Sequence, residues 1–413
     1  MATSVQTQFN VGGVLLDRPF KARRLGHFGF NVTKMEECLH FYTELLGFRI
    51  SDARDLFRSR ATPEQVKQME AFGDTNGYFT RFGSDHHSFV LFNKQAREWM
   101  DTERKFKPGV TINQITWQVG SLAEVGNAIK WFREQGVHLQ RAGRDMPGSN
   151  WHTYLYDPDG HTNELYYGIE QVGWNGHSKP LSMYKRGFRE APPLPQISEF
   201  QEVQDALAEG VDLLSGYRYA EQMPATYEVG GIMMPRPFKI VGIGPVSLFV
   251  EDVEASKAFY QDALGFTLCE EVEWQGYKCA FLRVNTEHHS MALYPIALRK
   301  ALGLSDHTTN MAFGVKLANY QQLRDAVAFL KEHGVPVIDA IPQELHPGID
   351  YAAHVLDPEG HCIQLYCEME QIGWDGKPKP AEMRRKVQAG AWPDALDATT
   401  DTYRGEPFLG PWE

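Results

Sequence analysis

The chain has 413 residues, enough for about two or three domains with full-sized cores, and its content of 42% hydrophobic and 23% charged residues is typical of a globular protein. Its formal net charge of −12 argues against a nucleic-acid partner, because neutralising phosphates requires a basic surface. The polar residues 1–10 and the lack of an apolar run of about eighteen residues predict neither a secretory signal nor a membrane span. Five scattered cysteines without a CxxC pair suit reduced thiols, so we expect a cytoplasmic protein.

The first predicted element is a strand over residues 25–32. Its aromatic and β-branched side chains alternate on one face, and His27 lies on the other. A helix is predicted to follow, opening at Thr33 with Glu36 as a capping box and ending at Gly47. Because the apolar stripe of this helix would pack on the aromatic face of the strand, we expect His27 to face away from that core.

Two further helices are predicted in the first half of the chain. One covers residues 61–73, with Thr62 as its cap, and is interpreted either as surface decoration or as a wall that narrows substrate choice. The other begins at Ser121, after a strand over residues 112–119. Alternation in that strand places Gln114 on the same face as Ile112, Thr116 and Gln118, opposite Ile115, Trp117 and Val119.

The chain then repeats itself. Residues 11–21 return as residues 229–239, and the turn at 157–161 returns at 357–361. The offset falls from 218 residues at Val11 and Val229 to 200 at Asp157 and Asp357, because the first copy carries extra residues, largely between positions 51 and 76. Each copy divides again into two units of strand, capped helix and further strands. The pattern therefore predicts an α+β protein with four βαβββ motifs.

These repeats suggest where the modules begin and end. A short helix is expected over residues 197–207, and the Trp-centred stretches at 174–176 and 374–376 are interpreted as structural latches. The predicted units are an N-terminal arm (1–24), an N-terminal module (25–170), a Pro-containing linker (171–239), a C-terminal module (240–370) and a C-terminal arm (371–413).

Several short motifs give the chain a family resemblance. It resembles the vicinal oxygen chelate (glyoxalase/bleomycin resistance/dioxygenase) superfamily, and within it the type I extradiol ring-cleaving dioxygenases. The resemblance implies that the four motifs pair into two cup-shaped modules. The motifs are Leu25-Gly26-His27-Phe28, Leu46-Gly47-Phe48, Asp85-His86-His87-Ser88 and Asn163-Glu164-Leu165-Tyr166.

The resemblance also implies a divalent metal, Fe(II) or alternatively Mn(II), held by two histidines and one glutamate. Carried over to this chain, the ligands are His27 and Glu164, and the second histidine position falls on Gln114. An amide oxygen can bind a divalent ion, and the glyoxalase branch uses glutamine in this way. In the second copy the matching positions are uncharged, so that cup is expected to be metal-free. They are Pro245, Asn310 and Gln364.

Further site residues follow from the same resemblance. His87 matches the acid–base residue, and Tyr154 matches a tyrosine that hydrogen-bonds the substrate oxygen. His86 and Asp145 are expected to contact substrate, although Asp145 stands where the family has another histidine. His161 and its repeat His361 are expected to hold their Asp-Pro turns.

The resemblance implies an Fe(II)-dependent extradiol dioxygenase that cleaves a catechol-like aromatic with O₂ in its N-terminal module. We expect a homo-oligomer with no nucleic-acid or membrane partner. Two alternatives stay open: a glyoxalase-like metal-dependent isomerase or lyase, favoured by the amide ligand, and a metal-free protein of the same fold that binds an aromatic compound. Metal content separates the binding protein from the enzymes, and oxygen uptake separates the two enzymes.

Overall fold

The computed structural model describes residues 8–58, 61–100, 109–148, 150–373, 375–387 and 391–396. The N-terminal module contains β3 (Arg24–Val32), α1 (Met35–Leu39) continued by the π-helical turn His40–Leu45, β4 (Arg49–Arg54), α2 (Pro63–Met69), β5 (Gly77–Arg81), β6 (Phe89–Asn93), α3 (Lys94–Met100), β7 (Ile112–Gln118), α4 (Leu122–Glu134), β8 (Leu139–Arg144), β9 (Trp151–Tyr156) and β10 (Thr162–Tyr167).

The C-terminal module contains β13 (Ile240–Val250), α6 (Val253–Asp262), β14 (Thr267–Trp274), β15 (Tyr277–Arg283), β16 (Met291–Pro295), α7 (Ile296–Ala301), β17 (Asn310–Leu317), α8 (Tyr320–Glu332), β18 (Val337–Ile338), β19 (Ala352–Leu356) and β20 (Cys362–Tyr366). Outside the modules lie β1 (Phe9–Val11), β2 (Val14–Leu16), α5 (Glu199–Ala208), β11 (Tyr227–Val229) and β12 (Ile232–Met234). The short helix expected at 197–207 is therefore present as α5.

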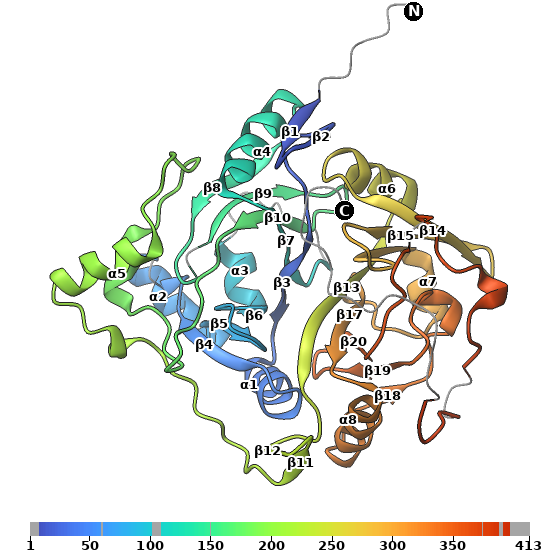
Figure 1. Cartoon of the computed structure of the whole chain (residues 1–413). Coiled ribbons are helices and arrows are strands. Elements are labelled where there is room, and N and C mark those ends of the chain that lie inside the picture. The colour runs from blue at the N-terminus through green and yellow to red at the C-terminus, as the bar shows by residue number, and fades with distance from the viewer. Residues whose placement is uncertain are drawn as a thin grey trace, which may run out of the picture.

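Each module is built on one eight-stranded mixed sheet, and the two sheets have the same strand order (Figure 1). The orders are β4-β5-β6-β3-β7-β10-β9-β8 and β14-β15-β16-β13-β17-β20-β19-β18. In each sheet two βαβββ motifs meet at the central antiparallel pair, β3 with β7 or β13 with β17. The predicted α+β architecture of four motifs in two cup-shaped modules is confirmed.

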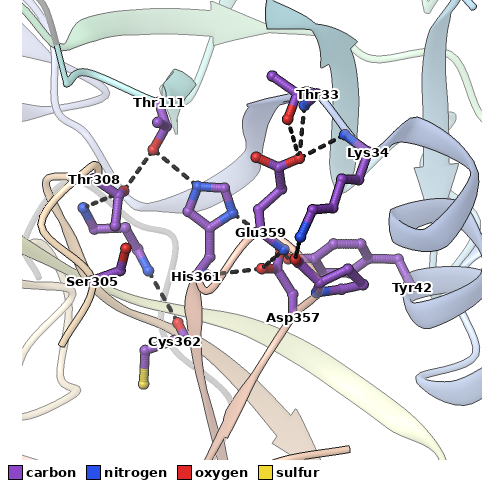
Figure 2. Close-up of polar contacts among 12 residues, drawn as sticks. Thr33, Lys34, Tyr42, Thr111, Ser305, Thr308, Asp357, Glu359, His361 and Cys362 are labelled. Carbon is purple, nitrogen blue, oxygen red and sulfur yellow. Dashed lines mark hydrogen bonds and ion pairs between the residues drawn. The ribbon is translucent and has the colours of Figure 1, made fainter.

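The predicted helix caps mostly hold. The side chains of Ser121 and Asn319 accept hydrogen bonds from backbone N–H groups at the starts of α4 and α8, and Thr62 forms a full capping box for α2. The capping box predicted at Thr33 is wrong. Instead, Glu359 of the other module accepts hydrogen bonds from the backbone N of Thr33 (2.8 Å) and of Lys34 (2.6 Å), so the cap of α1 comes from a distant loop (Figure 2).

The convex faces of both sheets, with α1, α4, α6 and α8, share one continuous hydrophobic core. Phe28 of β3 stacks on Phe313 of β17 with ring centroids 4.4 Å apart, and Phe30 stacks on the His361 ring. β3 and β13 contact each other at the centre of Figure 1. Because the two modules bury their apolar surfaces against one another, the fold does not divide into two independent cores.

Polar contacts between the modules are reciprocal. The imidazole of His361 binds Asp357 (3.0 Å) and Thr111 (2.9 Å), while Tyr42 donates to Asp357 (2.8 Å), as Figure 2 shows. The repeated residue His161 binds Asp157 (2.8 Å) and Thr309 (2.8 Å) in the same way. The expectation that these histidines hold their Asp-Pro turns is confirmed, and each also joins its module to the other.

The hairpins β1–β2 and β11–β12 each precede one module and contact the other. Arg18, which follows β2, donates to the backbone oxygen of Gln261 (3.1 Å), and Arg236, which follows β12, donates to that of Glu44 (2.9 Å). Each guanidinium lies against a glycine with positive φ, Gly265 or Gly47, where a Cβ atom would collide with it. This is the structural reason for the repeated Arg-Pro-Phe-Lys run.

A β-bulge changes the predicted parity of β7. The register shifts between Gly29–Gln114 and Phe30–Ile112, so that Ile112 packs in the shared core whereas Gln114 faces the opposite side. Their predicted common face is therefore wrong. The same shift in β17 places Ala312 opposite Ser247. The residue that corresponds to Gln114 is thus Ala312, and the predicted match to Asn310 is wrong by two positions.

Other expectations have mixed outcomes. The side chain of Trp174 is 99% exposed, so it does not act as a latch, and Trp374 lies outside the described residues. All five cysteines have free thiols. In the described part of the chain, no helix combines the length and the apolar character that a membrane crossing needs.

Candidate functional site

Two of the predicted metal ligands meet on the concave face of the N-terminal sheet. His27 on β3 and Glu164 on β10 both lie in register with Thr116 of the intervening strand β7. The Nε2 atom of His27 is 3.1 Å from Oε2 of Glu164, and both side chains are 0% exposed. The fold therefore brings together two residues that are far apart in the sequence, at the floor of a cup.

Glu164 is held by neutral hydrogen-bond donors. Thr116 donates its hydroxyl to Oε2 (2.9 Å), and Asn150 donates its amide to Oε1 (2.7 Å). Burial by itself would raise the pKa of Glu164, but His27, followed by His152 and the hydrogen bond from Thr116, more than offsets it and holds the pKa below its ordinary value. Glu164 is therefore an ionised carboxylate at neutral pH, and no Lys or Arg within the described ranges forms a salt bridge with it.

This donor set fits a divalent cation. Two adjacent ligands of an octahedral ion, each about 2.1 Å from it, lie about 3 Å apart, which is the separation of His27 Nε2 and Glu164 Oε2. No group of three His, Cys, Asp or Glu side chains that could hold a metal occurs among the described residues. A third protein ligand must therefore be of another type, and the amide of Gln114 lines the same cavity.

The cavity above this pair has a volume of about 340 Å³. His27, Gln114, His87 and Tyr154 line it together with apolar side chains. The inserted stretch contributes Leu56 and Phe57, whereas the helix α2 lies elsewhere, so the loop before the helix forms the wall. The remaining apolar lining residues are Phe79, Phe92, Met100, Met146 and Pro147.

A chain of hydrogen bonds runs from this cavity into the protein. The Nδ1 atom of His87 is 3.1 Å from Nδ1 of His86, and Nε2 of His86 is 3.2 Å from a carboxylate oxygen of Asp52. Tyr184 donates its hydroxyl to the same carboxylate oxygen. Burial, followed by the neighbouring His27 and His86, holds the pKa of His87 well below its ordinary value, so His87 is neutral at pH 7.

The proposed substrate contact of His86 finds no support in this geometry. Both of its ring nitrogens have partners within the protein, and the residue is 0% exposed and does not line the cavity. Asp145 does line the cavity, but Arg141 (2.6 Å) and Arg189 neutralise its carboxylate. Tyr154 lies under the Arg141 guanidinium, 4.3 Å from ring centroid to Cζ, and burial raises its pKa, so it keeps its phenolic proton.

Sequence reasoning missed three residues of this site. Thr116 and His152 could have been found from strand alternation, because each lies two positions from a predicted residue, Gln114 or Tyr154. His152 is fully buried, with Nδ1 3.9 Å from Glu164, and burial lowers its pKa. Asn150 precedes β9 in a loop without periodicity, so nothing in the sequence pattern could place its amide on Glu164.

Comparisons with known proteins agree with this organisation. The family model described as the Glyoxalase/Bleomycin resistance protein/Dioxygenase superfamily matches residues 24–165 and 242–365. A 2,2',3-trihydroxybiphenyl dioxygenase of Sphingomonas paucimobilis is 29% identical over 134 residues, which are 32% of this chain and 44% of the relative. Metapyrocatechase 2 of Cupriavidus necator is 27% identical over 151 residues, 36% of this chain and 38% of the relative. The chain thus spans less than half the length of these two relatives.

Solved structures share the fold at low sequence identity. A catechol 2,3-dioxygenase superposes with a TM-score of 0.52 at 16% identity, covering 89% of this chain and 93% of that chain. An Mn(II)-bound glyoxalase from Novosphingobium aromaticivorans gives 0.51 at 15% identity, covering 86% and 85%. Both solved structures therefore share the fold of this chain.

Proposed function

This chain belongs to the Glyoxalase/Bleomycin resistance protein/Dioxygenase superfamily, and from that membership we propose that its N-terminal module is a metal-dependent extradiol-type dioxygenase that cleaves a catechol-like ring with O₂. The observation that carries the proposal is the buried pair of His27 and Glu164, 3.1 Å apart, beside a cavity that His27, His87 and Tyr154 line. The name of the Sphingomonas paucimobilis relative, a 2,2',3-trihydroxybiphenyl dioxygenase, supports the same activity. The homo-oligomeric state and cytoplasmic location remain predictions.

The residues that would hold the metal, Fe(II) or alternatively Mn(II), are His27, Gln114 and Glu164. A divalent ion there would act as a Lewis acid and electron conduit toward the substrate hydroxyls. A doubly deprotonated catechol would bring two negative charges close to the carboxylate of Glu164. Such binding is unfavourable unless a neighbouring residue takes up a substrate proton, so the protonation state of these residues matters.

His87 is the group that would take a substrate proton. Since a carboxylate can only accept, His86 carries its proton on Nε2, toward Asp52, and its Nδ1 must accept from Nδ1–H of His87. The Nε2 atom of neutral His87 then carries an unshared lone pair, so it can act as a general base. Release of the same proton from Nε2 later in the reaction would return His87 to its starting tautomer.

Tyr154 and the apolar wall would orient the substrate. The raised pKa of Tyr154 keeps it a hydrogen-bond donor at neutral pH. Leu56 and Phe57 from the insertion, which pack against the cluster of Phe79 and Phe92, would contact an aromatic ring and exclude water. Asp145 would act through Arg141, which lies over the Tyr154 ring, as a positioning residue.

Oxygen consumption tests the proposal directly. The whole chain is reconstituted anaerobically with Fe(II) and mixed with single-ring and two-ring catechols in a closed oxygen-electrode cell. We expect one O₂ consumed per catechol, with a coloured ring-fission product. Loaded enzyme that consumes no O₂ with any catechol, while still containing metal, would contradict the proposal.

The second candidate is isomerase or lyase chemistry at the same metal. The presence of an amide, Gln114, where a histidine would be expected favours it, because an amide oxygen is a harder donor than an imidazole and suits non-redox ions. Product formation under strictly anaerobic conditions would identify this activity. The Gln114→His variant separates the two, since we expect it to strengthen Fe(II) binding and raise oxygen uptake.

A further inference from the structure

A second and larger cavity, with a volume of about 910 Å³, borders the C-terminal sheet. It is lined by residues of both edge strands, β14 and β18, by residues of α8 and of the segment 381–387, and by Trp392. In Figure 1, β14 is yellow, α8 and β18 are orange, and residues 381–387 are red. Pro245, Ala312 and Gln364, the counterparts of the predicted metal ligands, do not line it. His354, the counterpart of Tyr154, does, so the cavity corresponds only to the outer part of the N-terminal cup.

Two buried imidazoles lie in the lining of this cavity, which also contains charged side chains. His346 and His354 both line it, are 7% and 4% exposed, and have ring centroids 5.4 Å apart. The Nε2 atom of His354 has no hydrogen-bond partner among the residues that the structure describes. Such an unsatisfied buried group is unusual, because removing a polar atom from water without a replacement bond is costly. Its position in a cavity indicates that a ligand supplies the bond.

The charge state of the imidazoles limits the ligand. Burial lowers the pKa of His346 to about 4 and holds that of His354 well below its ordinary value, so both are neutral at pH 7. A neutral imidazole has one donor and one acceptor nitrogen, which suits a hydroxyl group better than a carboxylate or a phosphate. The charged side chains lining the cavity are either paired, as Arg384 is with Glu270 (2.6 Å), or exposed.

The walls around the imidazoles are apolar and well anchored. Val272, Val337, Ile338 and Trp392 line the cavity from three different elements. Tyr320 donates to the backbone oxygen of Pro393 (2.7 Å), next to Trp392, and Gln343 accepts from the backbone N of Val387 (3.0 Å) at the end of the segment 375–387. Hydrogen bonds therefore hold both described segments against the C-terminal module.

We propose that this cavity is a second binding site, for an uncharged flat compound of two or more rings whose hydroxyl group hydrogen-bonds to His354. The cavity is well over twice the volume of the N-terminal one, which suits more than a single ring. Among the described residues no group of three His, Cys, Asp or Glu side chains around this cavity could hold a metal, so the proposed role is binding. The site is independent of the dioxygenase activity proposed above.

Calorimetric titration of the metal-free full chain with 2-naphthol tests this site. The probe has one hydroxyl and two rings, and without adjacent hydroxyls it is no catechol. Ala328→Trp, on an exposed position of α8 that lines the cavity, should remove one equivalent of binding by filling the space. His354→Leu should weaken the same equivalent about tenfold, the usual cost of one hydrogen bond. His307→Leu, an exposed histidine outside the cavity, is the matched control and should bind as the unmodified chain does.

Two outcomes would overturn the proposal. One is the absence of saturable binding in the unmodified chain up to the solubility of the probe. The other is unchanged stoichiometry and affinity in both Ala328→Trp and His354→Leu, which would place the bound probe elsewhere. Since neither outcome involves oxygen uptake, a failure here is distinct from a failure of the proposed enzyme activity.

Discussion

The concave faces of the two modules are built by corresponding strands, yet one encloses a polar cavity and the other is filled with side chains. On the N-terminal sheet, Asn113 donates to Asn31 (2.7 Å) beside the cavity. The corresponding residues of the C-terminal sheet are Met311 and Phe249, which belong to a second hydrophobic cluster. This cluster also contains Phe281, Tyr294, Ile341, Leu345 and Cys362.

The difference shows that a few side chains distinguish an open cup from a filled one. Where the N-terminal cup has the polar residues Asn31, Asn113 and Gln114, the C-terminal cup has Phe249, Met311 and Ala312, and its concave side is part of a hydrophobic cluster. The loop carrying Leu345 then covers it, and Tyr294 donates to the backbone oxygen of Leu345. The convex face, which holds the two modules together, is unaffected, so the fold survives the change.

The largest expected effect comes from the carboxylate that one cup has and the other lacks. Glu164→Gln should abolish metal retention, because it removes the only anionic ligand, and loss of residues that merely support a ligand already costs about 10–100-fold in affinity. Metal content after anaerobic loading and gel filtration measures this. The reverse change, Gln364→Glu, should gain no metal, since neither Pro245 nor Ala312 supplies a second donor. Metal bound by Gln364→Glu would break the comparison.

The second prediction compares the repeated His-His pairs of the two modules. His87→Gln should lower the rate of oxygen uptake about 10²–10⁴-fold, the usual contribution of a general base, with metal content unchanged. The matched change His289→Gln should leave the rate as it is, because His289 faces a filled cup. Equal losses of the oxygen-uptake rate in both variants would show that the His-His pairs affect the rate through the stability of the fold and not through proton transfer.

A third prediction concerns the filled cup itself. Phe281→Ala should cost about 3–5 kcal/mol in the free energy of unfolding, because its ring is 0% exposed and tightly surrounded. The corresponding change Phe79→Ala should cost about 1 kcal/mol less, since Phe79 borders an existing cavity. Urea denaturation of the two variants measures the difference. A larger loss for Phe79→Ala would mean that the N-terminal cup depends more on its apolar wall than the geometry indicates.

The smallest effect is expected at the contact between modules. Burial opposes the charge of Asp357, but His361 and Tyr42 hold its pKa below the ordinary value. A folded-state pKa below the unfolded one adds stability at neutral pH that is lost as the pH falls through the folded value. Asp357→Asn should therefore cost about 1.5–3 kcal/mol at pH 7, and the cost should shrink on acidification below about pH 4. Thermal unfolding at several pH values tests this, and a cost independent of pH would contradict it.

Most of the fold could be predicted from the sequence because its signals are local. Alternation, side-chain caps and the repeat itself need only neighbouring residues or a comparison of two stretches. The cap of α1 could not be predicted, because Glu359, which supplies it, lies in the other module. The bulge at Asn113 was equally hidden, since a period of two carries no sign of an extra residue.

The candidate site was predictable in part for the same reason. His27 and Glu164 lie in motifs, and their meeting follows from the fold that the motifs indicate. The partners of Glu164 are different, because Thr116 and Asn150 are ordinary polar residues until the strands are placed side by side. The filling of the C-terminal cup depends on a loop, 341–350, whose path no periodic pattern describes.

Arg18 and Arg236, which follow the two hairpins, each contact the opposite module, and this has a consequence for how the protein could be divided into two fragments. Since Arg18 clasps the loop at Gly265 and Arg236 the loop at Gly47, each half carries a piece that the other half requires. If the backbone were cut in the proline-rich stretch near residue 195, we expect the two fragments to stay bound to each other. Either fragment made alone would instead expose its part of the shared hydrophobic core to solvent. Gene halves expressed together should thus reassemble, and halves expressed apart should precipitate.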